Sequence, residues 1–236
     1  MTDRLSIVRE NLQAVRQRIA DAAGRAGRDP AGVRLVGVSK YVDAATSGLL
    51  VEAGCRALGE SRPQQLWAKA AAAELAGADV EWHLIGHLQR NKVRQTLPVA
   101  ALLHSVDSPR LLAAVQQAAQ TLGLRARALL EVNCSGDPEK HGLAPDELEA
   151  VVASLPDFPA VQIDGLMTMA AREGGRSEAQ SNFAELRELR DRVAASAPDG
   201  VTLSELSMGM SGDFEEAIAE GATLVRVGSA LWDGLR

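Results

Sequence analysis

Cysteine, tyrosine and long apolar runs are scarce in this chain of 236 residues. The two cysteines, Cys55 and Cys134, lie far apart, which argues against a disulfide framework or a zinc site. No uninterrupted apolar stretch is long enough to cross a bilayer. The first residues, Met1-Thr2-Asp3-Arg4, lead into an amphipathic pattern without the apolar core of a signal peptide. We therefore expect a cytoplasmic protein that does not partner a membrane.

Positive charge is also in deficit, because the formal net charge at pH 7 is −6. Binding to nucleic acid or to anionic membranes needs a basic surface, so the sequence argues against both kinds of partner. The one basic cluster, Arg90, Lys92 and Arg94, predicts a solvated helix face. Apolar residues make up 46% of the chain and charged residues 24%, which is typical of a soluble globular protein.

Short β-rich runs alternate with helical stretches after a long amphipathic segment. Apolar residues from Leu5 to Ala26 recur at spacings of three and four, which predicts a helix within residues 1–28. Two later helices are expected, one beginning at Asp107-Ser108-Pro109 and one over 177–195. Eight strands are expected, over residues 33–38, 55–59, 80–86, 101–106, 126–133, 161–167, 202–207 and 224–228.

Eight strands, the first seven each followed by a helical segment, predict an α/β protein that is a single closed (β/α)8 TIM barrel. The alternative is a doubly wound open sheet. Such a sheet usually carries a glycine-rich loop after its first strand, where this chain has Ser39-Lys40-Tyr41-Val42. No linker interrupts the pattern, so residues 1–236 are expected to form one domain, with an extra N-terminal helix and no second domain.

Lysine is rare, with four lysines beside 21 arginines, and Lys40 closes the first expected strand. A primary amine at the end of a buried strand is costly, because desolvation disfavours the ammonium form. A neutral amine is the nucleophile that forms Schiff bases with aldehydes. The alternative is a lysine that merely extends from the strand end into solvent. Lys40 alone leaves both readings open.

The segments after the last two strands suggest an anion site. In this fold, phosphate groups often bind at the loops after strands seven and eight. Small residues stand there, Ser207 and Ser211 in one loop and Gly228 and Ser229 in the other, although such glycines also simply make turns. A phosphate in this place puts an attached aldehyde within reach of Lys40. Pyridoxal phosphate and phosphorylated sugars both satisfy this geometry.

Seven segments, in order along the chain, carry a resemblance to a known family. They are 36–40 (VGVSK), 58–60 (LGE), 82–92 (WHLIGHLQRNK), 104–107 (HSVD), 165–167 (GLM), 206–211 (LSMGMS) and 225–229 (VRVGS). Together they resemble the pyridoxal phosphate homeostasis proteins (the YggS/PROSC type). The resemblance implies a barrel of the alanine racemase type without that enzyme's second domain.

The same resemblance implies roles for particular residues. Lys40 is expected to be the Schiff-base lysine that holds pyridoxal 5'-phosphate covalently, and Arg226 to face the pyridine nitrogen. An arginine there keeps the nitrogen unprotonated and weakens the cofactor as an electron sink. The phosphate is expected at Ser211, Gly228 and Ser229, with Ser207 as a second candidate.

One segment departs from the family pattern. The family usually has asparagine after Gly-Glu at the second strand, and this chain has Gly59-Glu60-Ser61-Arg62. The polar contact of that asparagine near the cofactor is expected to be shortened or replaced by water.

Two other functions compete with a non-catalytic carrier that delivers the cofactor to apo forms of dependent enzymes. A racemase needs a second base, which alanine racemases take as a tyrosine from the second domain of a partner subunit. The one tyrosine here, Tyr41, adjoins Lys40 itself. Without the second domain through which such racemases dimerise, a monomer is expected. A Schiff-base aldolase needs an acid-base group near Lys40. The nearest candidate is Glu60, which is expected to have a structural role.

The histidines could be acid-base residues, but structural roles are expected for His83 and His104. His83 is expected to be a hydrogen-bonded interior residue, and His104 to have a structural role linked to Asp107. His87 is the best alternative for a functional group. No grouping has the spacing of metal ligands.

Overall fold

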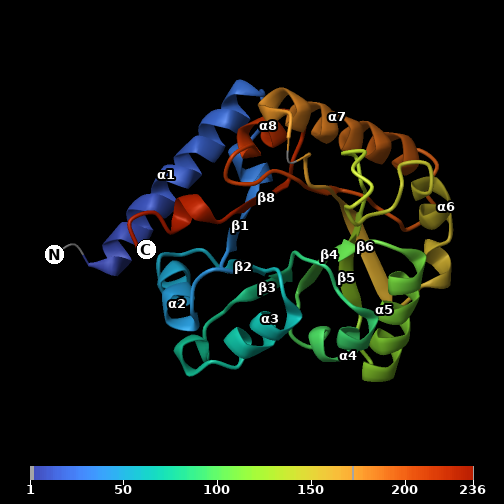
Figure 1. Ribbon diagram of the computed structural model, residues 1–236. Helices are drawn as coiled ribbons and strands as arrows, with labels where there is room; N and C mark the ends of the chain where they lie inside the picture. The colour runs from blue at the N-terminus through green and yellow to red at the C-terminus, as the bar shows by residue number, and fades with distance from the viewer. Residues whose placement is uncertain (1–2, 172, 236) are drawn as a thin grey trace.

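The computed structural model describes residues 3–171 and 173–235. Eight parallel strands pair in sequence order, and β1 pairs with β8 to close the barrel (Figure 1). The strands are β1 (Arg34–Val38), β2 (Ala57–Glu60), β3 (Glu81–Leu84), β4 (Leu102–Val106), β5 (Ala126–Glu131), β6 (Val161–Met167), β7 (Glu205–Ser207) and β8 (Leu224–Val227). The predicted barrel is confirmed, and each expected strand overlaps an observed one.

Several strands are shorter than the sequence suggested. The ladder of β3 stops at Leu84, and β7 begins only at Glu205 instead of at residue 202. Apolar character continues past the last ladder hydrogen bond, so residue type alone overextends a strand. The residues after Leu84 belong to a loop at the barrel mouth, whereas residues 202–204 precede β7 at the opposite end of the barrel.

Helices surround the barrel on the outside (Figure 1). They are α1 (Arg4–Arg25), α2 (Ala44–Glu52), α3 (Pro63–Ala70), α4 (Val93–Thr96), α5 (Pro109–Leu122), α6 (Leu148–Ala153), α7 (Gly175–Ala194) and α8 (Phe214–Ala219). The proline start of α5 is confirmed, with the Ser108 hydroxyl accepting from the Leu111 amide. None of the described helices is both long and apolar enough to cross a membrane.

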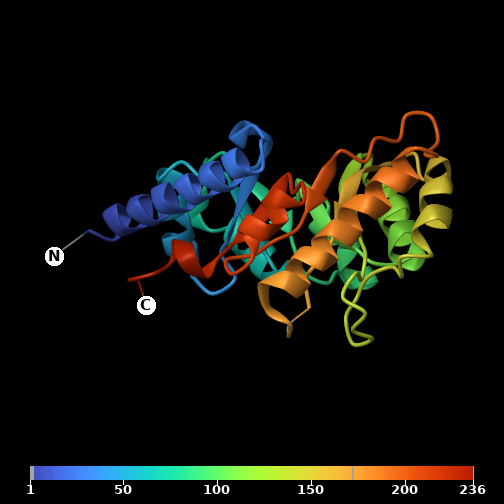
Figure 2. The ribbon, with the colours of Figure 1, turned by 90° about the horizontal axis from the view of Figure 1, so that it is seen from above.

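Helix α1 is the expected addition at the N-terminal end. It buries one apolar face, including Val8, Leu12, Val15 and Ile19. It packs beside α8 and α2, and both views show the two ends of the chain lying on the same side of the molecule (Figures 1 and 2). Burial of about four large side chains contributes roughly 6–12 kcal/mol before entropy is counted, which fixes α1 to the barrel.

Apolar side chains also fill the interior of the barrel. A cluster of six buried residues fills the inside: Val36, Ala57, Leu102, Leu129, Met167 and Leu224. Side chains alternate along a strand, so Val38, two residues after Val36, is also directed to the inside. The filled interior leaves the mouth at the C-terminal ends of the strands as the place for a site.

Candidate functional site

A pocket of about 360 Å³ opens at the barrel mouth. That volume lies within the range of small-molecule sites, roughly 300–1,000 Å³. Its walls come from the loops that follow β1, β2, β3, β6, β7 and β8. Five of the six predicted cofactor residues line it: Lys40, Ser211, Arg226, Gly228 and Ser229.

Lys40 lies two residues after the end of β1, behind Ser39, and is exposed at the pocket edge. Its Nζ lies 4.9 Å from the centroid of the Tyr41 ring, which is itself 73% exposed. Of the two readings that the sequence left open, the structure has the side chain that extends from the strand end into solvent. Lys40 remains a candidate nucleophile because its amine lies at the edge of a pocket that also contains Arg226.

Arg226 lies at the floor of the pocket on β8 and is only 3% exposed. Its Nη2 donates to the carbonyl of Thr168 at 2.9 Å, and its Nη1 donates to the Ser207 hydroxyl at 2.6 Å. Burial lowers the pKa of Arg226 to about 10, while the charge of Glu131 opposes that change. The guanidinium is thus a fixed cation at neutral pH and can only donate hydrogen bonds.

Ser207 lies beneath the pocket instead of in its wall. Its hydroxyl contacts Arg226 on one side and Nδ1 of His104, at 2.8 Å, on the other. The structure therefore gives Ser207 the place of a residue that orients Arg226. The Ser211 hydroxyl, in contrast, reaches the pocket.

A buried polar chain continues from Ser207 across the barrel. Nε2 of His104 lies 2.8 Å from Nδ1 of His83, and Nε2 of His83 lies 3.3 Å from Glu81 on β3. Burial lowers the pKa of both histidines, so they are neutral at pH 7. His83 is confirmed as an interior residue. The expected link between His104 and Asp107 is wrong, because Asp107 pairs with His87 at 2.9 Å.

The opposite end of the pocket is built from backbone and hydroxyl groups. The Gly228 amide donates to the Ser211 hydroxyl at 3.0 Å, so that hydroxyl accepts from the backbone and keeps its own proton for donation. A Cβ atom at Gly228 would lie 3.3 Å from Cβ of Val38, so glycine lets β8 approach β1 closely. Donors of this kind suit an anion such as phosphate.

The wall between β2 and β3 contains the segment that departs from the family pattern. Ser61 lines the pocket together with Gly86. A Cβ atom at Gly86 would lie 2.3 Å from the Ser61 carbonyl oxygen, so only glycine fits there. Ser61 thus offers a shorter polar side chain where the family has asparagine.

The end of β1 is held by a buried ion pair that the sequence did not reveal. Lys69 on α3 forms an ion pair with Glu60 on β2, and both side chains are buried. Lys69 also donates to the Ser39 carbonyl at 2.7 Å, and the Ser39 hydroxyl donates to Glu60 at 2.8 Å. These contacts fix the residue directly before Lys40. The sequence did not reveal this pair, because the spacing of nine residues between Glu60 and Lys69 matches neither the period of a helix nor that of a strand.

Glu131 on β5 is a second group that the sequence did not reveal. It is 4% exposed, and burial, together with the nearby charge of Asp107, raises its pKa to about 7. The only signal was one acidic residue inside the apolar run ALLEVN. Its charge acts on Arg226 from within the barrel.

Comparison with known proteins defines the class first. The family "Alanine racemase, N-terminal domain" matches residues 10–235. Alanine racemase from Streptomyces coelicolor shares the fold, with a TM-score of 0.72 and 20% identity over 97% of this chain and 58% of that one. The chain is therefore a barrel of the alanine racemase type.

The family follows from closer relatives. Pyridoxal phosphate homeostasis proteins of Aquifex aeolicus and Pseudomonas aeruginosa are each 38% identical, over 94% and 97% of this chain and 96% of each relative. The structure of PipY from Synechococcus elongatus with pyridoxal phosphate bound has a TM-score of 0.83 and 36% identity, covering 95% of this chain and 99% of that one. This chain belongs to the pyridoxal phosphate homeostasis protein family.

Proposed function

We propose that this protein binds pyridoxal phosphate as a Schiff base on Lys40 and serves cofactor homeostasis without strong catalysis. The observation that carries the proposal is the convergence of an amine, a buried arginine and a cluster of amide and hydroxyl groups on one pocket. These three features match an aldehyde, a ring nitrogen and a phosphate. When bound, pyridoxal phosphate supplies an aldehyde and an electron-withdrawing ring.

Each group has a separate task in this proposal. The Ser211 and Ser229 hydroxyls donate to the phosphate, and the Gly228 amide joins them when it gives up its hydrogen bond to Ser211. Arg226 faces the ring nitrogen and, being a donor only, leaves that nitrogen unprotonated. Its two hydrogen bonds below the pocket, to Thr168 and Ser207, hold the guanidinium in a fixed position.

The side chains around the pocket favour holding the cofactor over turning it over. Among the described residues that line it, those with ionisable side chains are Lys40, Tyr41 and Arg226. Tyr41 directly follows Lys40, so the pocket offers no acid-base group on a second face. Losing a positioned general acid or base costs roughly 10²–10⁴-fold in rate. We further propose that the protein is a cytoplasmic monomer that delivers the cofactor to apo-enzymes.

The test is borohydride reduction of the protein loaded with pyridoxal phosphate, followed by mass spectrometry of its peptides. We expect the modification on Lys40, and we expect the visible absorption band of the adduct to disappear in Lys40→Ala. Lys92→Ala is the matched control, since Lys92 lies over the Trp67 ring and is not among the residues that line the pocket, so the band should be unchanged. An equal, trappable adduct in Lys40→Ala would remove Lys40 from the site.

A second measurement separates the carrier from a racemase. Loaded protein is incubated with a panel of amino acids in deuterated solvent, and loss of the α-proton is followed by NMR. We expect no exchange at an enzyme-like rate. Rapid exchange with any one amino acid would contradict a non-catalytic carrier, and loss of chirality of that amino acid would identify a racemase.

A further inference from the structure

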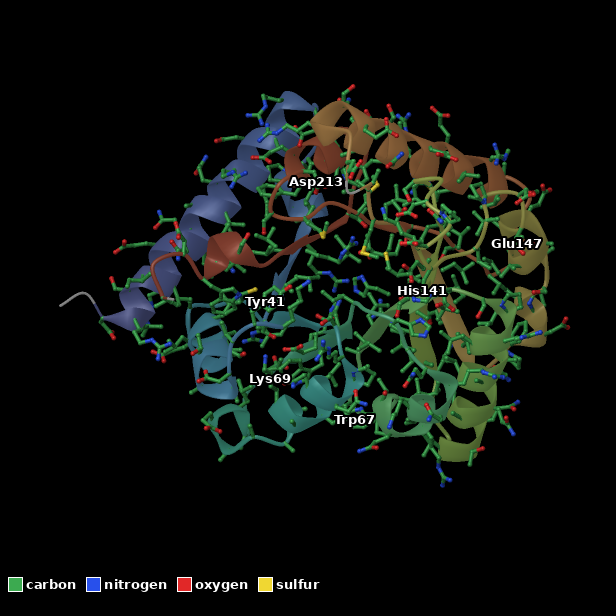
Figure 3. The ribbon with its side chains drawn as sticks, viewed as in Figure 1. Tyr41, Trp67, Lys69, His141, Glu147 and Asp213 are labelled. Carbon is green, nitrogen blue, oxygen red and sulfur yellow. The ribbon has the colours of Figure 1, made fainter. Side chains whose placement is uncertain are left out.

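A second polar cluster lies at the barrel mouth, apart from the pocket that contains Lys40. It consists of His87 in the loop after β3, Asp107 at the end of β4 and His141 in the loop after β5. Figure 3 shows His141 well separated from Tyr41, on the side of β4 and β5. Far apart in sequence, these residues meet because the C-terminal ends of three neighbouring strands share one face.

The three side chains face one another closely. Oδ2 of Asp107 lies 2.9 Å from Nδ1 of His87 and 3.9 Å from Nδ1 of His141. The two imidazole rings stack, with centroids 4.2 Å apart and an interplanar angle of 16°. One potential ligand atom from each residue lies within 4.8 Å of the other two. Two imidazole nitrogens and a carboxylate oxygen therefore converge on one small volume.

We propose that His87, Asp107 and His141 bind a late first-row divalent cation, with Zn²⁺ as the representative ion. Bond lengths of about 2.0–2.1 Å in a tetrahedral site place neighbouring ligand atoms roughly 3.3 Å apart. The two distances to Asp107 lie on either side of that value, and the stacked imidazole rings tilt apart on binding so that the lone pairs of both nitrogens point at the ion. Two imidazoles with one carboxylate favour Zn²⁺, Co²⁺, Ni²⁺ or Cu²⁺ over Mg²⁺ and Ca²⁺, which take oxygen ligands.

The surroundings hold the ligands while leaving access from solvent. Asp107 has a side chain only 10% exposed, and its Oδ1 accepts from the Ser108 hydroxyl at 3.0 Å, which directs Oδ2 to the histidines. The loop bearing His141 is tied down by Lys140, whose Nζ donates to the Ala170 carbonyl at 2.7 Å. The side chains of His87 and His141 are 42% and 60% exposed.

A surface pocket adjoins His87 and Asp107. Its volume is about 610 Å³, and Arg90 and Arg110 also line it. A three-ligand site with an open position retains a water molecule or takes an anion there. The two arginines make an anionic fourth ligand compatible with the site.

The test uses tag-free full-length protein titrated with ZnCl₂ by calorimetry and with CoCl₂ by visible absorption. We expect one Zn²⁺ per chain, bound in preference to Mg²⁺, and the intense visible bands of Co²⁺ in a low-symmetry nitrogen and oxygen site. His87→Ala and His141→Ala should each weaken Zn²⁺ binding at least about tenfold, since even outer contacts of metal sites are worth roughly 10–100-fold. Asp107→Asn should weaken it while keeping the shape of the side chain.

Asp79→Asn is the matched control, because Asp79 is an exposed carboxylate in an ion pair with Arg56. It should leave Zn²⁺ binding unchanged. The proposal is overturned if the wild-type protein binds no Zn²⁺, or if the two histidine variants bind it as tightly as the wild type does. Loss of binding in Cys134→Ser with retention in His141→Ala would place the ion elsewhere and equally overturn it. None of these results depends on whether Lys40 carries a cofactor.

Discussion

At the scale of single residues, the backbone position of Lys40 depends on the buried ion pair between Glu60 and Lys69. Glu60 and Lys69 hold both the hydroxyl and the carbonyl of Ser39, the residue directly before Lys40. The indole of Trp232 also donates to the Val38 carbonyl at 2.8 Å. An exposed lysine thus projects from a backbone that is fixed from below. Such fixation lets a flexible side chain begin from a defined point.

Lys69→Met should reveal the strength of this ion pair. The variant leaves the carboxylate of Glu60 buried without its partner, and breaking a buried pair in this way costs about 3–5 kcal/mol. Urea unfolding measures the loss, and Glu60→Gln combined with Lys69→Met should recover part of it. Arg9→Ala is the control, since it breaks an exposed pair with Glu52 that is worth about 1 kcal/mol or less. Equal losses in Lys69→Met and Arg9→Ala would contradict the buried ion pair as a main support.

At the scale of secondary structure elements, the close contact between β6 and β7 depends on one glycine, Gly165. A Cβ atom at Gly165 on β6 would lie 1.9 Å from the Glu205 carbonyl oxygen on β7. The contacting atoms belong to backbone, which cannot move aside as a flexible side chain does. Glycine at this position therefore lets β7, the shortest of the eight strands, enter the barrel and place Ser207 under Arg226.

Gly165→Ala should destabilise the protein by more than about 3 kcal/mol, because the overlap separates the two strands. The measurement is the midpoint of chemical unfolding. Gly24→Ala in α1 is the matched control, since its Cβ would meet no atom within 4 Å. Alanine there should cost nothing and can add up to about 1 kcal/mol of helix stability. A Gly165→Ala protein as stable as wild type would show that the barrel tolerates a wider strand separation.

At the scale of the whole molecule, the charges buried inside the barrel tie its stability to pH. Glu131 keeps its proton in the folded protein up to a pKa of about 7, above the ordinary value of 4.5. Between these two pH values the unfolded chain has released that proton while the folded chain retains it. The contribution of Glu131 to stability therefore falls as pH rises through this window and is constant above it. Neutral His83 and His104 act oppositely, losing stability as pH falls below about 6.5.

Glu131→Gln isolates the first of these effects. The free energy of unfolding of the variant, relative to wild type, should rise between pH 5 and pH 7 and stay level from pH 7 to 8. The rise is of the order of 2–3 kcal/mol, from about 1.4 kcal/mol per pH unit. Urea titrations at four pH values measure it. Parallel profiles of the two proteins would show that Glu131 does not titrate in this window.

The sequence singled out residues that the fold brings together, but it did not show how they are connected. Lys40, Ser211, Arg226, Gly228 and Ser229 line one pocket, and their part in cofactor binding stays a prediction. Ser207 stands in the same short motif as Ser211, yet it faces the inside of the barrel. Strand register decides between the two directions, and a shift of one residue reverses them. Motif order alone therefore cannot separate a pocket residue from one that orients its neighbour.

The sequence by itself determined the barrel, because eight apolar runs alternating with helical segments have few other ways to bury their surfaces. It also determined that the groups following β1, β7 and β8 meet, since closure brings those strands together. Only the tertiary structure decided the buried contacts between distant residues, such as Lys69 with Glu60 and His104 with Ser207. Those contacts join elements far apart in the chain, and they depend on side-chain distances that no periodicity encodes.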